Sequence, residues 1–129
     1  MSRVQLALNV PDIDEAVAFY SRLFGAEPAK RRQGYANFAL DDPALKLVLI
    51  ESADASEHLN HLGVEVSSTT EVRAATDRLA GEGLPTRTED GTECCYAVQD
   101  KVWVQAPNGA PWEIYTVLSD VPEGVHGCC

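Results

Sequence analysis

Three side chains at related places in the sequence have the atom types that bind a divalent cation. Gln5 lies near the start of the first apolar segment, and His61 lies at the same place in a second one. Glu113 stands between the large apolar residues Trp112 and Ile114. A carboxylate buried there needs a partner, because burial of a bare charge is costly. One divalent cation would satisfy all three side chains. The alternative is that Gln5 and Glu113 face water and that His61 packs as a structural residue.

The four cysteines form two adjacent pairs, Cys94–Cys95 and Cys128–Cys129. Neighbouring cysteines bridge each other only through a strained ring, so a disulfide framework is not favoured. Two adjacent thiols can instead hold a soft, thiophilic centre. Cys94 and Cys95 lie in a polar loop, which makes at least one thiol reachable; the alternative is that both are small residues without a role. His126, Cys128 and Cys129 are candidates for accessory soft-metal binding or are an incidental end of the chain.

The ligand pattern is incomplete in the first half of the chain. Residues 47–50, where a fourth ligand would fall, are all aliphatic. We therefore expect three protein ligands and open positions opposite them, which suits a metal that takes up substrate and oxygen. His58 precedes His61 by an odd number of residues, so in an extended chain the two point to opposite faces. We assign His58 to a linker.

A repeated order of elements must position these candidates. In the first half, periodicity and turn residues predict strands over 4–10, 35–40 and 45–50, a helix over 13–24, and a strand or its turn over 30–34. In the second half they predict strands over 61–66, 85–89, 96–105 and 112–118, with a helix between residues 68 and 81. Asp12 with Glu15, and Ser68 with Glu71, form capping-box patterns at the two helix starts. The order βαβββ thus occurs twice, and Gln5 aligns with His61.

This order predicts an α+β fold of two βαβββ modules whose curled mixed sheets enclose a metal-binding cleft. We expect a single domain over residues 1–118, with module one over about 1–52 and module two over about 60–118. Residues 52–60 are the expected linker. Residues 119–129 are the expected flexible tail with the second cysteine pair.

Composition narrows the classes of function. The chain has 129 residues and a formal charge of −10, which disfavours nucleic acids and anionic membranes as partners. No apolar run approaches the roughly 20 residues that span a bilayer. The N-terminus lacks a signal-peptide pattern, so we expect a cytoplasmic protein, in which structural disulfides are rare.

The doubled βαβββ order with these ligand positions resembles the vicinal oxygen chelate superfamily, which includes glyoxalase I, extradiol dioxygenases and bleomycin-binding proteins. More closely, the chain is similar to the carbon–arsenic lyases and the related cadmium-induced proteins. The segments that carry this similarity span 4–10, 34–39, 45–49, 60–66, 94–97, 99–104 and 111–115. The Cys-Cys pair followed by Gln-Asp-Lys-Val-Trp-Val is the specific part.

The resemblance implies an Fe(II)- and O₂-dependent lyase that cleaves the C–As bond of methyl- or aryl-arsenites for detoxification. It implies that Gln5, His61 and Glu113 hold the iron, and that Cys94 and Cys95 bind trivalent arsenic. In the protein as isolated, Ni, Co or Zn can occupy such a site in place of iron. The alternatives are a cadmium-inducible protein that binds soft metals and a glyoxalase-type isomerase. The modules pair within a monomer or are exchanged in a homodimer; both remain open.

Overall fold

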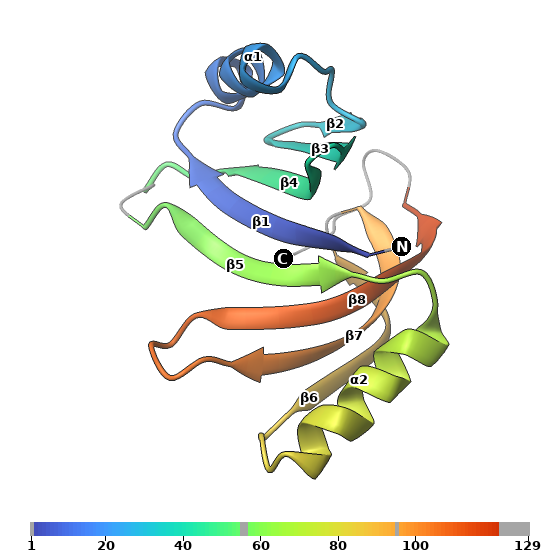
Figure 1. The fold of residues 1–129 in the computed structure, drawn as a ribbon. Coiled ribbons are helices and arrows are strands. Elements are labelled where there is room, and N and C mark those ends of the chain that lie inside the picture. The colour runs from blue at the N-terminus through green and yellow to red at the C-terminus, as the bar shows by residue number, and fades with distance from the viewer. Residues whose placement is uncertain (1, 55–56, 95, 122–129) are drawn as a thin grey trace. The chain divides into compact units, whose positions relative to one another are not determined.

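The computed structural model describes residues 2–54, 57–94 and 96–121. Two helices and eight strands follow in this order: β1 (Arg3–Val10), α1 (Ile13–Phe24), β2 (Lys30–Arg32), β3 (Tyr35–Asp41), β4 (Ala44–Glu51), β5 (Leu59–Glu65), α2 (Thr69–Gly81), β6 (Arg87–Cys94), β7 (Ala97–Gln105) and β8 (Pro111–Asp120). Figure 1 shows this course along the chain. The α+β class and the βαβββ order in both halves are confirmed.

The chain divides into two compact units, and the boundary falls within β5. The N-terminal unit comprises residues 4–62, and the C-terminal unit comprises residues 1–3 and 63–129 as far as they are described. In the N-terminal unit the strands lie in the order β2-β3-β4-β1, followed by the first part of β5. In the C-terminal unit the last part of β5 is followed by β8-β7-β6.

The N-terminal unit is a mixed sheet covered on one face by α1. β1 pairs with β4 in parallel, and β3 pairs with β4 antiparallel. The helix starts at Asp12, whose side chain accepts a hydrogen bond from the Glu15 amide at 3.1 Å. It ends at Gly25, which adopts a left-handed φ of 63° that glycine takes without strain. The capping expected from the sequence is therefore confirmed at this helix.

Strand alternation separates the two faces of the N-terminal sheet. The face toward α1 carries the core, made of Val10, Ile13, Val17, Ala36, Phe38, Leu40, Leu47 and Leu49, with Leu6 and Leu8 packed against it. Since side chains alternate along a strand, Gln5, Ala7 and Asn9 of β1 point to the opposite face. Gln5 therefore lies on the side of the sheet away from the helix.

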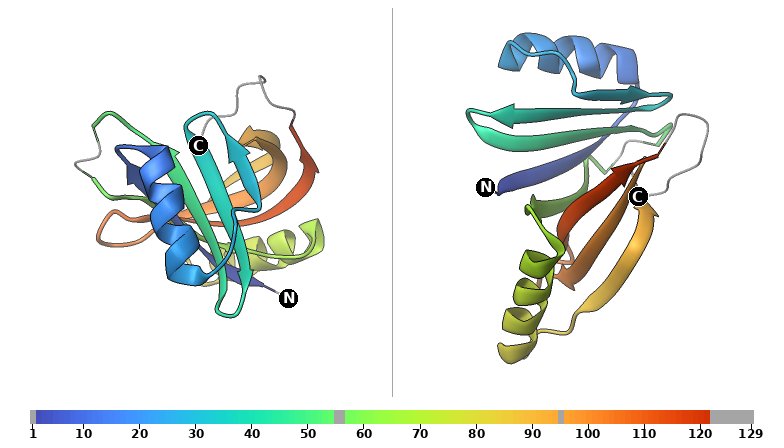
Figure 2. Two further views of the ribbon diagram at one scale, coloured as in Figure 1. Left: turned by 90° about the horizontal axis from the view of Figure 1, so that it is seen from above. Right: turned by 90° about the vertical axis from the view of Figure 1, so that its right-hand side faces the viewer.

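The C-terminal unit repeats this arrangement with α2. Ser68 caps the helix through a hydrogen bond from the Glu71 amide, as its capping box predicts. Val72 and Leu79 of α2 pack against Val102 of β7. Residues of odd number on β7, among them Lys101, therefore point away from α2. Figure 2 shows α1 along one face of β3 and β4, and α2 beside the strands of its own unit.

Several predicted bounds differ from the structure. β6 runs to Cys94 instead of ending at Glu89, because its pairing with β7 continues past an irregularity between Glu89 and Thr92. β5 begins at Leu59, inside the expected linker, and β8 extends to Asp120, inside the expected tail. Pairing partners decide where a strand ends, and single-sequence patterns do not contain that information.

In the residues that the structure describes, neither helix has the length and apolar character needed to cross a bilayer.

Candidate metal and thiol site

Gln5 and His61 meet on the face of the N-terminal unit that lies away from α1. The Gln5 side-chain nitrogen is 3.1 Å from His61 Nε2, and both residues are buried, with exposed fractions of 5% and 3%. The alternative in which Gln5 faces water is therefore wrong. A buried amide and a buried imidazole at this distance bring two potential metal-binding groups to one place.

Glu113 belongs to the C-terminal unit, where it forms an ion pair with Lys101. Lys101 Nζ lies 2.7 Å from Glu113 Oε1, and the side chains are 1% and 3% exposed. The lysine nitrogen also lies 5.4 Å from the Trp103 ring centroid and 5.8 Å from that of Tyr115, where cation–π attraction adds to the pair. Glu113 is thus a buried carboxyl group held next to a lysine, and the alternative in which it faces water is wrong.

The chemistry of these three side chains fits a divalent metal. An amide oxygen, an imidazole nitrogen and a carboxylate are ligand types that suit Fe, Mn, Co or Zn. Rotating the Gln5 amide by half a turn places its oxygen where the nitrogen now meets His61. Among the described residues, no three His, Cys, Asp or Glu side chains gather into a metal-binding group. A Gln–His–Glu set contains only two of those types, so it depends on the glutamine.

Cys94 is placed differently from the sequence prediction. It is the last residue of β6, 7% exposed, instead of a residue in a polar loop. It is disulfide-bonded, contrary to the expectation of free thiols. Cys95, His126, Cys128 and Cys129 also lie outside the described residues, so their assigned roles remain predictions.

Besides the pairing of β6 with β7, hydrogen bonds fix described residues on both sides of the turn next to Cys94. Gln99 donates its side-chain amide to the Cys94 carbonyl at 2.7 Å, and Gln99 is itself 4% exposed. The Val121 amide donates to the Tyr96 carbonyl at 2.9 Å. Tyr96 has a φ of 61°, which is uncommon for a residue with a side chain. A glutamine in a strand has no distinctive sequence pattern, so this role of Gln99 is visible only in the structure.

The strand register separates Cys94 from Glu113. Cys94 pairs with Ala97 on β7, and Glu113 pairs with Trp103 on the same strand. Ala97 and Trp103 are about 20 Å apart along an extended β7. The backbones of Cys94 and Glu113 are therefore separated by at most that distance in the direction of the strand.

Asp100 joins α2 to the irregular part of β6. Its carboxylate accepts hydrogen bonds from Thr69 Oγ1 at 2.7 Å and from the Gly91 amide at 2.8 Å. The bond from Thr69, and next the bond from Gly91, hold the pKa of Asp100 below its usual value of 3.8. Asp100 thereby fixes the segment that leads to Cys94.

We expect Asp100→Asn to destabilise the protein by about 1.5 kcal/mol at pH 7, because hydrogen bonds to a charged group are lost. A lowered folded-state pKa gives stability that is present above pH 3.8 and is lost as the pH falls through the folded value. The difference between the two proteins should therefore shrink below pH 3.8. Urea unfolding over a pH series measures it, with the exposed Asp77→Asn as control. A difference that grows toward acid pH would contradict the assignment.

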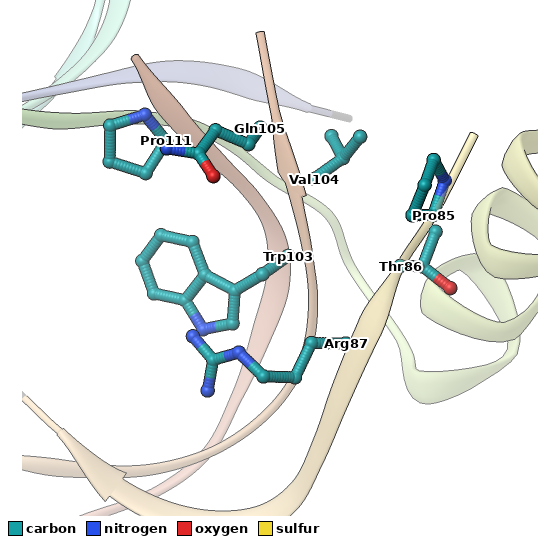
Figure 3. A pocket seen from close by; sticks show the side chains of 7 residues that line it. All are labelled: Pro85, Thr86, Arg87, Trp103, Val104, Gln105 and Pro111. Carbon is teal, nitrogen blue, oxygen red and sulfur yellow. The ribbon is translucent and has the colours of Figure 1, made fainter. Parts of the chain in front are cut away.

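A cavity of about 320 Å³ lies at one end of the C-terminal unit (Figure 3). Its lining residues are Pro85, Thr86, Arg87, Trp103, Val104, Gln105 and Pro111. Glu89 of β6 accepts a hydrogen bond from Trp103 Nε1 at 2.9 Å and forms an ion pair with Arg87 at 2.8 Å. Because Trp103 is the register partner of Glu113, the cavity begins one strand away from the buried carboxylate.

Comparison with known proteins gives one family and close relatives. Residues 3–114 match the Glyoxalase/Bleomycin resistance protein/Dioxygenase superfamily. A protein of Mycobacterium tuberculosis named "Cadmium-induced protein CadI" is 62% identical over 120 residues, which are 93% of this chain and 79% of that protein. The "Trivalent organoarsenical cleaving enzyme" of Thermomonospora curvata is 59% identical over 121 residues, which are 93% of this chain and 80% of that enzyme.

The fold also matches solved structures. The homoprotocatechuate 2,3-dioxygenase of Arthrobacter globiformis superposes with a TM-score of 0.65 at 21% identity, over 92% of this chain and 37% of the dioxygenase chain. At that identity the match concerns the fold alone. It confirms the expected architecture of curled, mixed sheets with two helices.

Proposed function

The chain belongs to the Glyoxalase/Bleomycin resistance protein/Dioxygenase superfamily, and from that premise we propose that it is a carbon–arsenic lyase. Its substrates are trivalent organoarsenicals, methyl- and aryl-arsenites, and it requires Fe(II) and O₂. The observation that carries the proposal is the buried contact between Gln5 and His61, which are 3.1 Å apart and are both of types that bind metals. The name of the Thermomonospora relative supports the substrate class.

In this proposal Gln5, His61 and Glu113 hold the metal. When bound, Fe(II) would supply the ability to bind and activate O₂ next to the substrate. Glu113 would be the one anionic ligand, and its carboxylate has a second oxygen besides the one that lies next to Lys101. Because amide and imidazole ligands carry no charge, a single carboxylate would offset only part of the charge of a divalent metal held by this set.

Cys94 and Cys95 hold the arsenic through their thiolates, since trivalent arsenic is soft and prefers sulfur. Both thiols must be reduced for this, so the disulfide at Cys94 has to be opened before substrate binds. The proposal also requires the β6–β7 hairpin to curl so that Cys94 approaches Glu113, because the strand register allows up to about 20 Å between these two residues along β7. Holding the C–As bond in place then raises its effective concentration at the metal.

The overall reaction balances with one O₂ for each C–As bond. Arsenic and carbon each gain one oxygen atom, so methylarsenite gives inorganic arsenite and formaldehyde. Carbon is oxidised and O₂ is reduced, and no other reductant is consumed. The cavity beside Trp103 gives room for a larger organic substituent on the face of the sheet that carries Glu113.

The direct test is aerobic incubation of the reduced, Fe(II)-loaded protein with methylarsenite. We expect inorganic arsenite, measured by chromatography coupled to elemental mass spectrometry, and none without O₂ or Fe(II). Absence of arsenite with iron bound and thiols reduced would overturn the proposal.

We expect Cys94→Ser to abolish arsenical turnover while metal binding stays unchanged, because a hydroxyl does not replace a thiolate toward arsenic. Arsenite release and metal content are measured on the same preparation. Cys128→Ser is the matched control and should keep full lyase activity. A Cys94→Ser protein that still releases arsenite at the wild-type rate would show that this thiol does not hold the substrate.

A second candidate is a cadmium-binding protein, which the name of the Mycobacterium relative favours. Tight cadmium binding that is lost on deleting residues 125–129, without lyase activity, would support it. Lyase activity that survives the same deletion would support the first candidate.

A further inference from the structure

The side chains of Asn9 and Asn60 connect His61 by hydrogen bonds to the linker between the two halves of the chain. Asn9 Nδ2 lies 2.8 Å from the Glu57 carbonyl oxygen. Asn60 Nδ2 lies 3.0 Å from Asn9 Oδ1, and Asn60 Oδ1 lies 2.7 Å from His61 Nδ1. All of these groups belong to the N-terminal unit. The proposed lyase site gives Asn9 and Asn60 no role.

The direction of each hydrogen bond in this series, from Glu57 through Asn9 and Asn60 to His61, follows from the backbone carbonyl of Glu57 at its start. A backbone carbonyl can only accept, so Asn9 must present its NH₂ group to Glu57. Its oxygen then faces Asn60, which must donate with its own NH₂ group. The Asn60 oxygen is left facing His61 at 2.7 Å, a distance at which two lone pairs would repel.

We infer that Asn60, oriented by Asn9, is a positioning residue that holds His61 in the tautomer with its proton on Nδ1. Nε2 then carries the lone pair, on the side of the ring where Gln5 lies 3.1 Å away. The assignment of the tautomer does not depend on the lyase proposal. The expected effect on metal binding does rest on that proposal, because the proposal makes His61 a metal ligand through Nε2.

We call the series of hydrogen bonds from Glu57 through Asn9 and Asn60 to His61 the relay. At its start, Asn9 is bonded to backbone carbonyl groups. The Asn9 backbone amide donates to the His58 carbonyl at 2.7 Å, while its side chain donates to the carbonyl of Glu57. Asn9 therefore ties the end of the linker to β1 through two bonds. The first acceptor is a backbone carbonyl, so it fixes the orientation of the Asn9 amide. The Asn9 amide in turn fixes the Asn60 amide, which faces the His61 ring.

An outer partner of this kind has a measurable effect on a metal ligand. A histidine that donates its second ring nitrogen to a fixed acceptor is oriented before the metal arrives, and loss of the acceptor typically weakens metal binding by about ten- to a hundredfold. A purely structural role for Asn60 would change stability and leave the tautomer of His61 unchanged.

The tautomer is tested on the metal-free, reduced wild-type protein. Nitrogen-15 NMR of the histidine rings at a pH of about 8, where a free imidazole is neutral, distinguishes the two nitrogens. We expect His61 to carry its proton on Nδ1, and Asn60→Ala to produce Nε2–H or a mixture. A wild-type ring protonated on Nε2 overturns the inference, and this measurement needs no variant to fold.

Metal affinity is tested by competing Co(II) between the protein and a chelator. We expect Asn60→Ala to weaken Co(II) binding by about ten- to a hundredfold. Asn60→Asp keeps an acceptor for Nδ1 and should bind within a few-fold of wild type. Asn37→Ala is the control, because Asn37 is a buried amide of the same unit that hydrogen-bonds to Tyr35 outside the relay.

Two results separate this inference from the lyase proposal. Equal Co(II) affinity in Asn60→Ala and wild type, with the tautomer changed, overturns the positioning role. Wild-type protein that shows the Nδ1–H tautomer and the Asn60 effect on Co(II), but releases no arsenite, supports the inference and overturns the lyase proposal alone.

Discussion

Replacing Lys101 with methionine should lower the free energy of unfolding of the metal-free protein by about 3–5 kcal/mol. The substitution keeps the length and apolar stem of the side chain but removes the ammonium that lies 2.7 Å from Glu113. Glu113 is 3% exposed, so its charge would remain buried without this cation. Urea unfolding measures the difference. This is the largest effect on stability that we expect from a single substitution in this chain.

The matched control removes both charges. Lys101→Met combined with Glu113→Gln should recover much of the stability, because a buried pair can be replaced by neutral groups at little cost. If Glu113 also binds a metal, Co(II) should stabilise Lys101→Met more than it stabilises the wild type. If Lys101→Met alone is as stable as the wild type, the burial of Glu113 does not depend on its ion pair with Lys101.

His61→Ala should remove metal binding and arsenite release together. The loss should exceed the roughly ten- to hundredfold weakening typical of an outer partner, because the substitution deletes a donor atom outright. Co(II) competition and arsenite release are measured on one preparation. Folding is checked by circular dichroism, since the side chain is 3% exposed.

His58→Ala provides the matched histidine control. His58 lies in the linker and is exposed, and its backbone carbonyl, which accepts from Asn9, is retained in the variant. It should bind Co(II) and release arsenite like the wild type. If both histidine variants lose metal equally, or if His61→Ala keeps it, the assignment of His61 is wrong.

Much of the fold was predictable because its signals are local. The capping residues Asp12 and Ser68 precede amphipathic segments, and both start helices in the structure. Gln5 and His61, which align along the repeat, also contact each other in the structure. The end of β6 was not predictable, because it depends on continued pairing with β7 beyond an irregularity.

The roles of polar side chains divide in the same way. Residue type and position by themselves determined the candidate donors Gln5, His61 and Glu113, because few side chains bind metals and the repeat aligned two of them. Only the tertiary structure showed that Lys101 neutralises Glu113 and that Asn60 faces His61. Lysine and asparagine are usually exposed, so a sequence pattern gives no reason to pair them. Burial makes those pairings necessary, and burial arises only when the strands and helices pack.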